Sequence, residues 1–420
     1  MGHIKNLDLR EIYSNEIPST TYLTHGIHPY TAKLIPHIPR YFIEKYTEKN
    51  NVILDPFCGS GTTLLEAKLL ERNAIGIDIN PLAILLSEVK TTHMDVEELK
   101  HAIQLYKENL KESEGKIFVE FPNIDYWFCN KAQNDLALIK YSIETFSSKV
   151  DRRIYKFLLL CFSSVIKKSS YADPIMAKTY KSKRVFKKIE KGWVPTPIPY
   201  FEKVIEKNLA RIKLLSELPN SSNNYIEVFH GDASDVSFIL KQKGITKVDF
   251  IMTSPPYINA QDYFRCYKLE LWWLGLATPE EVKYLNRKTL GTEKLSGVDY
   301  SFVPKSENRM LNTLLKRIWK INRKKSHIIY NYFRNMEVIF KQCYNVLKLG
   351  GYFCLVIGNN TICGIQIPTY RIFSQMAENT CFIVVEIWED EIKRRTLPPD
   401  RNHNGGVIKK ERIMIFQKKE

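Results

Sequence analysis

The fold is best predicted from the stretch Asn51-Val-Ile-Leu-Asp-Pro-Phe-Cys-Gly-Ser-Gly-Thr-Thr63 of this 420-residue chain. It runs from a short apolar segment, which predicts a buried strand, into a turn that contains Gly59 and Gly61. A helix is predicted over residues 64–71, and Ala74-Ile-Gly-Ile-Asp-Ile79 predicts the next strand. A strand, a glycine turn, a helix and a second strand form the skeleton of a nucleotide-binding βαβ unit.

The residue types in this unit suit a ligand that carries a ribose. Gly59 and Gly61 permit a tight turn and a close approach of a ligand to the backbone at a helix N-terminus. Asp78 closes the second strand about 20 residues after the turn, where a carboxylate accepts hydrogen bonds from ribose hydroxyls. The alternative is a structural βαβ unit without a ligand, which the combination of turn and acid disfavours.

A second motif, Thr253-Ser-Pro-Pro-Tyr257, follows the apolar run at 247–252. Proline lacks the N–H and restricts φ, so Pro255 and Pro256 predict a rigid loop directly after a buried strand. Because ligands of open α/β sheets bind at the carboxyl ends of strands, we expect this loop at the functional site.

The chemistry that suits this loop is the activation of an exocyclic amine, whose lone pair is delocalised into an aromatic ring. The Ser254 hydroxyl and the Pro255 carbonyl would accept the amine hydrogens and draw the nitrogen toward tetrahedral geometry. Tyr257 offers a face on which a flat base can stack. The alternative is a Pro-Pro turn followed by a surface tyrosine.

The composition is that of a globular protein of one large domain or two. No stretch approaches the length of a membrane span and the N-terminus has no apolar signal core, so a cytoplasmic location is expected. The eight cysteines form no C-x-x-C pair, which predicts reduced, mostly buried thiols and no metal site. The 62 basic and 46 acidic residues give a net charge of +16, which favours a polyanionic partner.

Residues 91–222 interrupt the α/β pattern. Helices are predicted at 96–116, 131–149 and 154–166, followed by an extended linker at 193–200.

A basic run lies within this region, between Lys178 and Lys191. Such a run with aromatic neighbours suits contact with phosphates, and the alternative is a solvated lysine-rich face. The residues predicted to bind nucleic acid are Lys181, Lys183, Arg184, Lys187 and Lys188.

The α/β pattern resumes with a strand in Tyr225–Ser234, where Asp232 is placed to accept a hydrogen bond from an adenine amino group or to cap a helix. A second elaboration is expected at 279–326, close to the site. The remaining predictions are a poorly defined arm over the first twenty residues, helices at 262–276, 327–347 (capped by Gly350-Gly351) and 370–378, and strands at 352–357, 382–388 and 412–416.

Together these motifs resemble the amino-methyltransferases that use S-adenosylmethionine to modify DNA at cytosine N4 or adenine N6. The resemblance implies a Rossmann-like α/β fold with a mostly parallel, seven-stranded sheet and a largely helical inserted recognition region. It covers about residues 22–90 and 225–275, and the C-terminal strands more loosely. The implied division is 1–90 for the N-terminal and cofactor-binding part, 91–222 for the insert, and 223–420 for the catalytic part with its second insert.

The resemblance also implies a role for individual residues. The catalytic residues would be Ser254, Pro255, Pro256 and Tyr257. The residues that bind S-adenosylmethionine would be His28, Pro29, Lys33, Asp55, Pro56, Phe57, Cys58, Gly59, Gly61, Thr62, Asp78, Ile79, Asn80, Asp232 and Ala233.

A serine in the first position of the catalytic tetrapeptide is commoner in the cytosine-N4 members, so transfer to cytosine N4 in double-stranded DNA is the predicted activity. The alternatives are adenine N6, an RNA base, and a nucleic-acid-binding protein that has lost activity. The implied partners are duplex DNA and a cognate restriction endonuclease, with no membrane. The large insert lies earlier in the chain than is usual for the family, so either insert is a candidate for target recognition.

Overall fold

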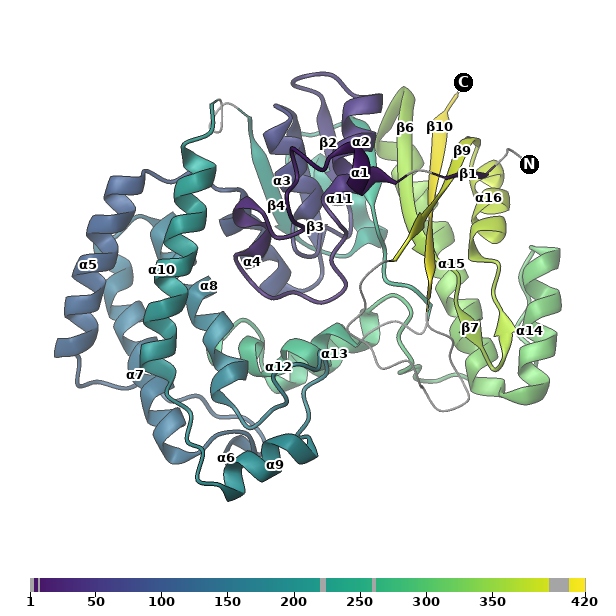
Figure 1. Ribbon diagram of the computed structural model, residues 1–420. Helices are drawn as coiled ribbons and strands as arrows, with labels where there is room; N and C mark the ends of the chain where they lie inside the picture. Colours follow the sequence, from purple (N-terminus) through teal and green to yellow (C-terminus); the bar gives the residue numbers. More distant parts are fainter. Residues whose placement is uncertain (1–3, 7, 220–223, 259–261, 393–407, 420) are drawn as a thin grey trace.

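The computed structural model describes residues 4–6, 8–219, 224–258, 262–392 and 408–419. In this part of the chain an eight-stranded sheet forms the centre of the molecule (Figure 1). Its strands lie side by side in the order β1 (Ile4–Asn6), β9 (Phe382–Glu391), β10 (Lys410–Lys418), β6 (Leu347–Gly358), β5 (Val248–Thr253), β2 (Val52–Asp55), β3 (Asn73–Asp78) and β4 (Ile226–His230). β10 runs antiparallel to both of its neighbours, and the other pairs are parallel. The mostly parallel α/β fold expected from the βαβ unit is therefore confirmed.

The sheet has eight strands where the family resemblance implied seven. The additional strand, β1, pairs with the edge of β9 and is followed by the short helix α1 (Leu9–Ile12). The expectation of a poorly defined arm is wrong for these residues, because Leu9 is buried and Arg10 bonds to Asp390. Three residues are too few to show an alternating pattern in the sequence. This strand forms because the edge of β9 offers unpaired backbone groups with which it can pair.

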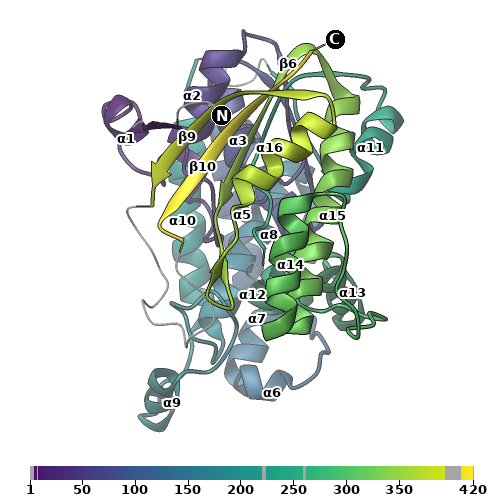
Figure 2. The ribbon, with the colours of Figure 1, turned by 90° about the vertical axis from the view of Figure 1, so that its right-hand side faces the viewer.

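The two faces of the sheet are covered by different helices (Figure 2). Successive residues of a strand point to opposite faces, so Ile53 packs with α2 (His37–Tyr46) and α3 (Thr62–Leu69), whereas Leu54 faces the other side. The helices on that second face are α11 (Val236–Gln242), α14 (Arg309–Ile321), α15 (Arg323–Val346) and α16 (Thr369–Asn379). A hairpin of two short strands, β7 (Thr361–Ile362) and β8 (Ile365–Gln366), precedes α16. Burial on both faces explains why the central strands β2, β3 and β5 are mostly apolar.

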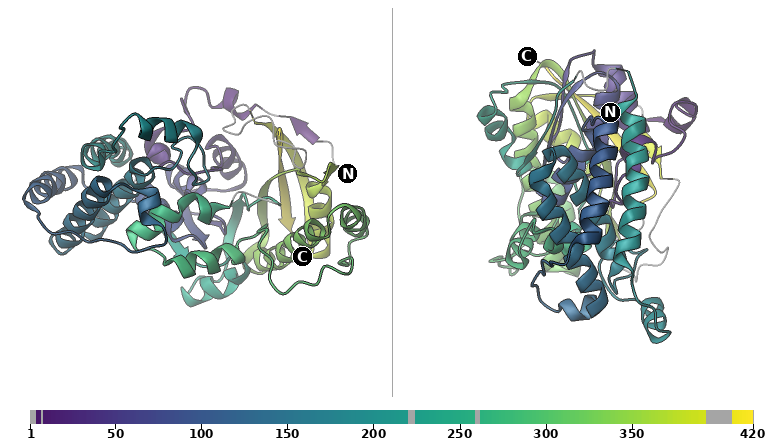
Figure 3. Two further views of the ribbon diagram at one scale, coloured as in Figure 1. Left: turned by 90° about the horizontal axis from the view of Figure 1, so that it is seen from below. Right: turned by 90° about the vertical axis from the view of Figure 1, so that its left-hand side faces the viewer.

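The insert forms a helical layer beside the sheet (Figures 1 and 3). Its helices are α5 (Val96–Glu112), α6 (Ile124–Trp127), α7 (Asn130–Phe146), α8 (Arg152–Ile166), α9 (Lys183–Glu190) and α10 (Pro197–Ser216). The long helices share one apolar core with α4 (Pro81–Thr91) and α12 (Tyr263–Leu274), which is followed by α13 (Pro279–Lys288). The insert is thereby packed directly on the helices that follow Asp78 and the Thr253–Tyr257 loop.

Two local predictions differ from the structure. The linker predicted at 193–200 is wrong in its second half, because α10 begins at Pro197, where a proline in the first turn removes no hydrogen bond. The cap predicted at Gly350-Gly351 is also wrong: α15 ends at Val346, and both glycines lie within β6, where the pairing with β5 is irregular.

All eight cysteines are free thiols and five of them are buried, as the sequence predicted. Among the described residues no helix is long and apolar enough to cross a membrane.

Candidate active site

The two motifs meet at one edge of the sheet, because β5, β2 and β3 are adjacent and parallel. Their carboxyl ends open into a cavity of about 320 Å³, a volume at the lower end of the range for small-molecule sites. The predicted site residues that line it are Lys33, Asp55, Pro56, Phe57, Cys58, Gly59, Thr62, Asp78, Ile79, Asn80, Asp232, Ala233, Ser254 and Pro256. Most of the predicted cofactor residues thus share one cavity with the first residue of the Ser-Pro-Pro-Tyr tetrapeptide.

Five predicted residues do not line this cavity: His28, Pro29, Gly61, Pro255 and Tyr257. His28 is buried and its Nε2 lies 2.6 Å from the Ser163 hydroxyl of α8, so it ties the N-terminal segment to the insert. Burial lowers the pKa of His28 to about 3, which keeps the ring neutral. The structure therefore places His28 behind the site, where it holds the insert in position.

The two glycines of the turn have different structural roles. Gly59 has a positive φ of 49°, and its N–H donates to Oδ2 of Asp78 at 2.9 Å. Gly61 has a φ of 69° and precedes α3, and a Cβ there would lie 2.8 Å from the Ser87 hydroxyl of α4. Gly59 shapes the cavity wall, whereas Gly61 allows α4 to pack against the turn.

The carboxyl group of Asp78 accepts hydrogen bonds from backbone N–H groups and also lines the cavity. Oδ2 accepts the Gly59 N–H, and Oδ1 accepts the Asn80 N–H at 2.8 Å. A carboxyl group has about four acceptor positions, so Asp78 can accept a further donor from the cavity that it lines. Burial raises the pKa of Asp78, and the two N–H bonds oppose that rise.

A direct hydrogen bond connects the two motifs. The Thr253 hydroxyl, at the end of β5, donates to Oδ1 of Asp55 at 2.6 Å, and the Phe57 N–H donates to the same oxygen at 3.1 Å. Burial raises the pKa of Asp55 to about 6 despite these bonds. Because both partners are buried, this contact sets the distance between the glycine turn and the Ser254 loop.

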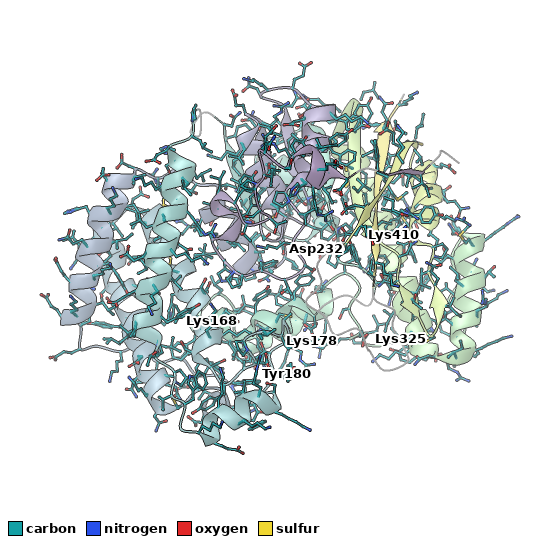
Figure 4. The ribbon with its side chains drawn as sticks, in the orientation of Figure 1. Lys168, Lys178, Tyr180, Asp232, Lys325 and Lys410 are labelled. Atoms are coloured by element: carbon teal, nitrogen blue, oxygen red, sulfur yellow. The ribbon has the colours of Figure 1, made fainter. Side chains whose placement is uncertain are left out.

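The structure shows the capping role predicted for Asp232, whereas its contact with an adenine amino group stays a prediction. Its Oδ1 accepts the Ser234 N–H at 2.9 Å and thereby caps a short 3₁₀ helix, Ala233–Asp235, and the residue also lines the cavity (Figure 4).

The structure adds residues to the site that sequence reasoning missed. Tyr30 lines the cavity and stacks on Tyr267 with ring centroids 4.9 Å apart; its place between His28 and Lys33 was the available signal. The end of α13 contributes Arg287–Leu290, and α15 contributes Asn335, Val338 and Ile339. Gly291 follows directly with a φ of 74°, and a Cβ there would lie 2.7 Å from the Tyr257 carbonyl oxygen. The beginning of the second insert is therefore a wall of the site.

Some of the insert residues that were predicted to bind phosphates already contact other side chains of the protein. Arg184 pairs with Asp173 at 2.8 Å, and Lys181 lies 3.9 Å from the centroid of the Tyr126 ring. Lys183 and Lys187 are exposed on α9, and Lys188, also exposed, lies 5.7 Å from the centroid of the Trp193 ring. α9 projects from the end of the helical layer (Figure 2).

Other lysines flank the site. Lys168 and Lys178 come from the helical layer, whereas Lys325 and Lys410 come from the sheet side (Figure 4). The two on the sheet side are paired with Glu293 and Glu389.

The fold and the site together define a Rossmann-like methyltransferase that uses S-adenosylmethionine. A family model described as DNA methylase matches residues 5–88 and 248–420, which is more than half of the chain. The protein therefore belongs to the N6/N4 DNA methylase family, as the motifs predicted. The whole helical insert, residues 91–222, lies between the two matched segments.

Individual relatives agree with this assignment. The type II methyltransferase M.MvaI of Kocuria varians is 26% identical over 377 residues, which cover 85% of this chain and 82% of the relative. The type II methyltransferase M.BsoBI of Geobacillus stearothermophilus is 26% identical over 432 residues, covering 88% of this chain and 80% of that protein. Among solved structures, TrmN from Thermus thermophilus aligns with 92% of this chain and 49% of its own at 10% identity and a TM-score of 0.32, too low to support any inference.

Proposed function

We propose that this protein is a type II DNA methyltransferase that methylates N4 of a cytosine flipped out of double-stranded DNA. The observation that carries the proposal is the position of Ser254, which lines the same cavity as the glycine turn and Asp78. A serine in this position favours cytosine, and a base inside a duplex must leave the stack to reach such a cavity. The named relatives are type II methyltransferases, which supports a modification role and makes a cognate restriction endonuclease a candidate partner.

The residues of the cavity fit S-adenosylmethionine. The Asp78 carboxyl group, which lines the cavity, would accept hydrogen bonds from the ribose hydroxyls. Asp232, which follows the neighbouring strand β4 and also lines the cavity, would accept one from the adenine amino group. Lys33, whose ammonium group donates to the His25 carbonyl at 3.0 Å, would lie near the methionyl end. When bound, the cofactor supplies a methyl group on a sulfonium, which is already activated for transfer.

The protein itself would contribute position and polarisation. The Ser254 hydroxyl would accept one hydrogen of the target amine and concentrate its lone pair on nitrogen. The Pro255 carbonyl is the second proposed acceptor; Pro255 itself lies beside the cavity lining, between Ser254 and Pro256. Tyr257 would stack on the extruded base, and the Thr253–Asp55 hydrogen bond would hold the amine in line with the methyl group.

We further propose that the helical insert, residues 91–222, reads the target. It shares its apolar core with α12, the helix that follows the catalytic loop, and all of it lies outside the segments matched by the family model. Arg287 and Lys288 of the second insert line the cavity, so we propose that this insert also contributes to target recognition.

Adenine N6 is the second candidate target, because the matched family comprises both N6 and N4 enzymes. Transfer of a tritiated methyl group from S-adenosylmethionine to mixed-sequence DNA and, in a parallel reaction, to RNA, followed by mass spectrometry of the nucleosides, distinguishes the two. We expect N4-methylcytosine. Detection of N6-methyladenine would show that adenine, and not cytosine, is the target base. Label in RNA but not in DNA would refute the proposal. A Ser254→Ala protein is the matched control for label that does not arise from this site.

A further inference from the structure

Tyr257 is held from outside the cavity. Its hydroxyl donates to Oε1 of Glu411 at 2.7 Å, across 154 residues of sequence. Glu411 lies on β10 opposite Gly358 of β6, and a Cβ on Gly358 would come within 2.9 Å of the Tyr257 ring. The ring therefore occupies a slot that has a glycine on one strand and a carboxyl group on the next.

Glu411 lies in a buried environment beside a second carboxyl group, where a carboxyl group needs a hydrogen-bond partner. Burial raises its pKa, and the hydrogen bond from Tyr257 opposes this rise. Its neighbour on β9 is Asp390, a second carboxyl group, which Arg10 binds at 3.0 Å. Because two adjacent carboxyl groups at a buried position repel each other, Glu411 is a poor choice for packing alone.

We propose that Glu411 is a positioning residue that fixes the ring of Tyr257 as the stacking platform for the target base. Tyr257 follows two prolines, which restrict the backbone of the loop but leave the tyrosine side chain free to rotate. The bond to Glu411, together with packing of the ring beside Gly358, restricts that freedom, so the ring is preorganised before the base arrives. This inference rests on the proposed function, because it assigns a partner to the residue expected to stack on the base.

A double-mutant cycle tests the proposal. Tyr257→Phe keeps the ring and loses the hydroxyl, and Glu411→Ala loses the acceptor. Each is expected to lower kcat about 10-fold on unmodified DNA, the effect of one lost hydrogen bond to a carboxyl group. The double variant should be no worse than either single variant, because both changes break the same bond.

Two further variants control for general damage to the fold. Glu411→Gln keeps an acceptor oxygen and is expected to retain kcat within about 3-fold of the parent, since a neutral hydrogen bond replaces a charge-assisted one. Glu391→Ala removes an exposed carboxylate at the end of the neighbouring strand β9 and should leave kcat unchanged. The dissociation constant of S-adenosylmethionine should be the same in all variants.

A readout that does not depend on activity is hydrogen exchange of the peptide that contains residues 254–258. Exchange at Tyr257 and Ile258 should accelerate in Glu411→Ala and in Tyr257→Phe, and return toward the parent rate in Glu411→Gln. Additive losses of kcat in the double variant, or unchanged exchange in both single variants, would overturn the proposal. If Glu411→Ala does not fold, parental activity in Tyr257→Phe is enough to refute it. Failure of the proposed function is distinct: the parent protein would then methylate no DNA, while the exchange data would still report on the bond.

Discussion

Asp78 offers the sharpest test of the cofactor site. In Asp78→Ala, two ribose hydroxyls lose a charged acceptor, and each such bond contributes about 1.5–3 kcal/mol. We therefore expect the affinity for S-adenosylmethionine to fall by at least about 3 kcal/mol, or roughly 150-fold. The Gly59 and Asn80 N–H groups lose their acceptor at the same time, which adds to the loss.

Asp78→Asn refines this estimate. The amide keeps one oxygen, so we expect it to satisfy one backbone N–H and one hydroxyl and to weaken binding about 10-fold. Titration calorimetry with S-adenosylmethionine measures both variants in the absence of DNA. Asp235→Ala is the matched control, because this carboxylate is exposed and lies outside the cavity lining, although it is only three residues from Asp232. An unaltered affinity in a folded Asp78→Ala protein would show that the end of β3 does not contact the ribose.

Three further predictions concern the other parts of the molecule. Ser254→Ala should lower kcat at least about 100-fold with little change in cofactor affinity, measured by single-turnover transfer; near-normal turnover would remove Ser254 from the mechanism. Lys183→Ala combined with Lys187→Ala should flatten the plot of log affinity for DNA against log salt by about 2 units without changing base preference, and an unchanged slope would assign α9 to a solvated surface. His28 is neutral in the folded protein because burial lowers its pKa to about 3, so protonation favours unfolding and stability falls as the pH drops below 6.5. Between pH 7 and pH 5 this loss amounts to about 2 kcal/mol, and in His28→Gln the corresponding part of the pH dependence of urea unfolding should disappear.

Features of the fold that depend only on residues close together in the sequence could be predicted. The apolar strands β2, β3 and β5, the glycine turn and the loop after Thr253 all follow from short-range rules for burial, glycine and proline. Since parallel strands end at the same edge, these rules also predicted that the two motifs meet in one cavity.

Errors arose where a local pattern had two solutions. The prolines in 193–200 suit an extended linker and also the first turn of α10, and packing of α10 against α8 and α5 selects the helix. The contact of His28 with Ser163, across 135 residues, is likewise invisible to any local pattern. The role of His28 toward the cofactor, which the family resemblance implied, stays a prediction.

Residue types in order along the chain were thus enough to predict the fold class and the cavity edge, because those depend on strand direction and on backbone conformations that only glycine and proline impose. The cofactor was predicted from the resemblance of the motifs to a known family. The partners of the catalytic loop were decided only by the tertiary structure. Thr253 meets Asp55 across 198 residues and Tyr257 meets Glu411 across 154, through strands that the chain visits in a different order from their order in the sheet. No local pattern carries this information, because a buried hydrogen bond between distant residues leaves each of them looking like an ordinary polar residue in its own segment.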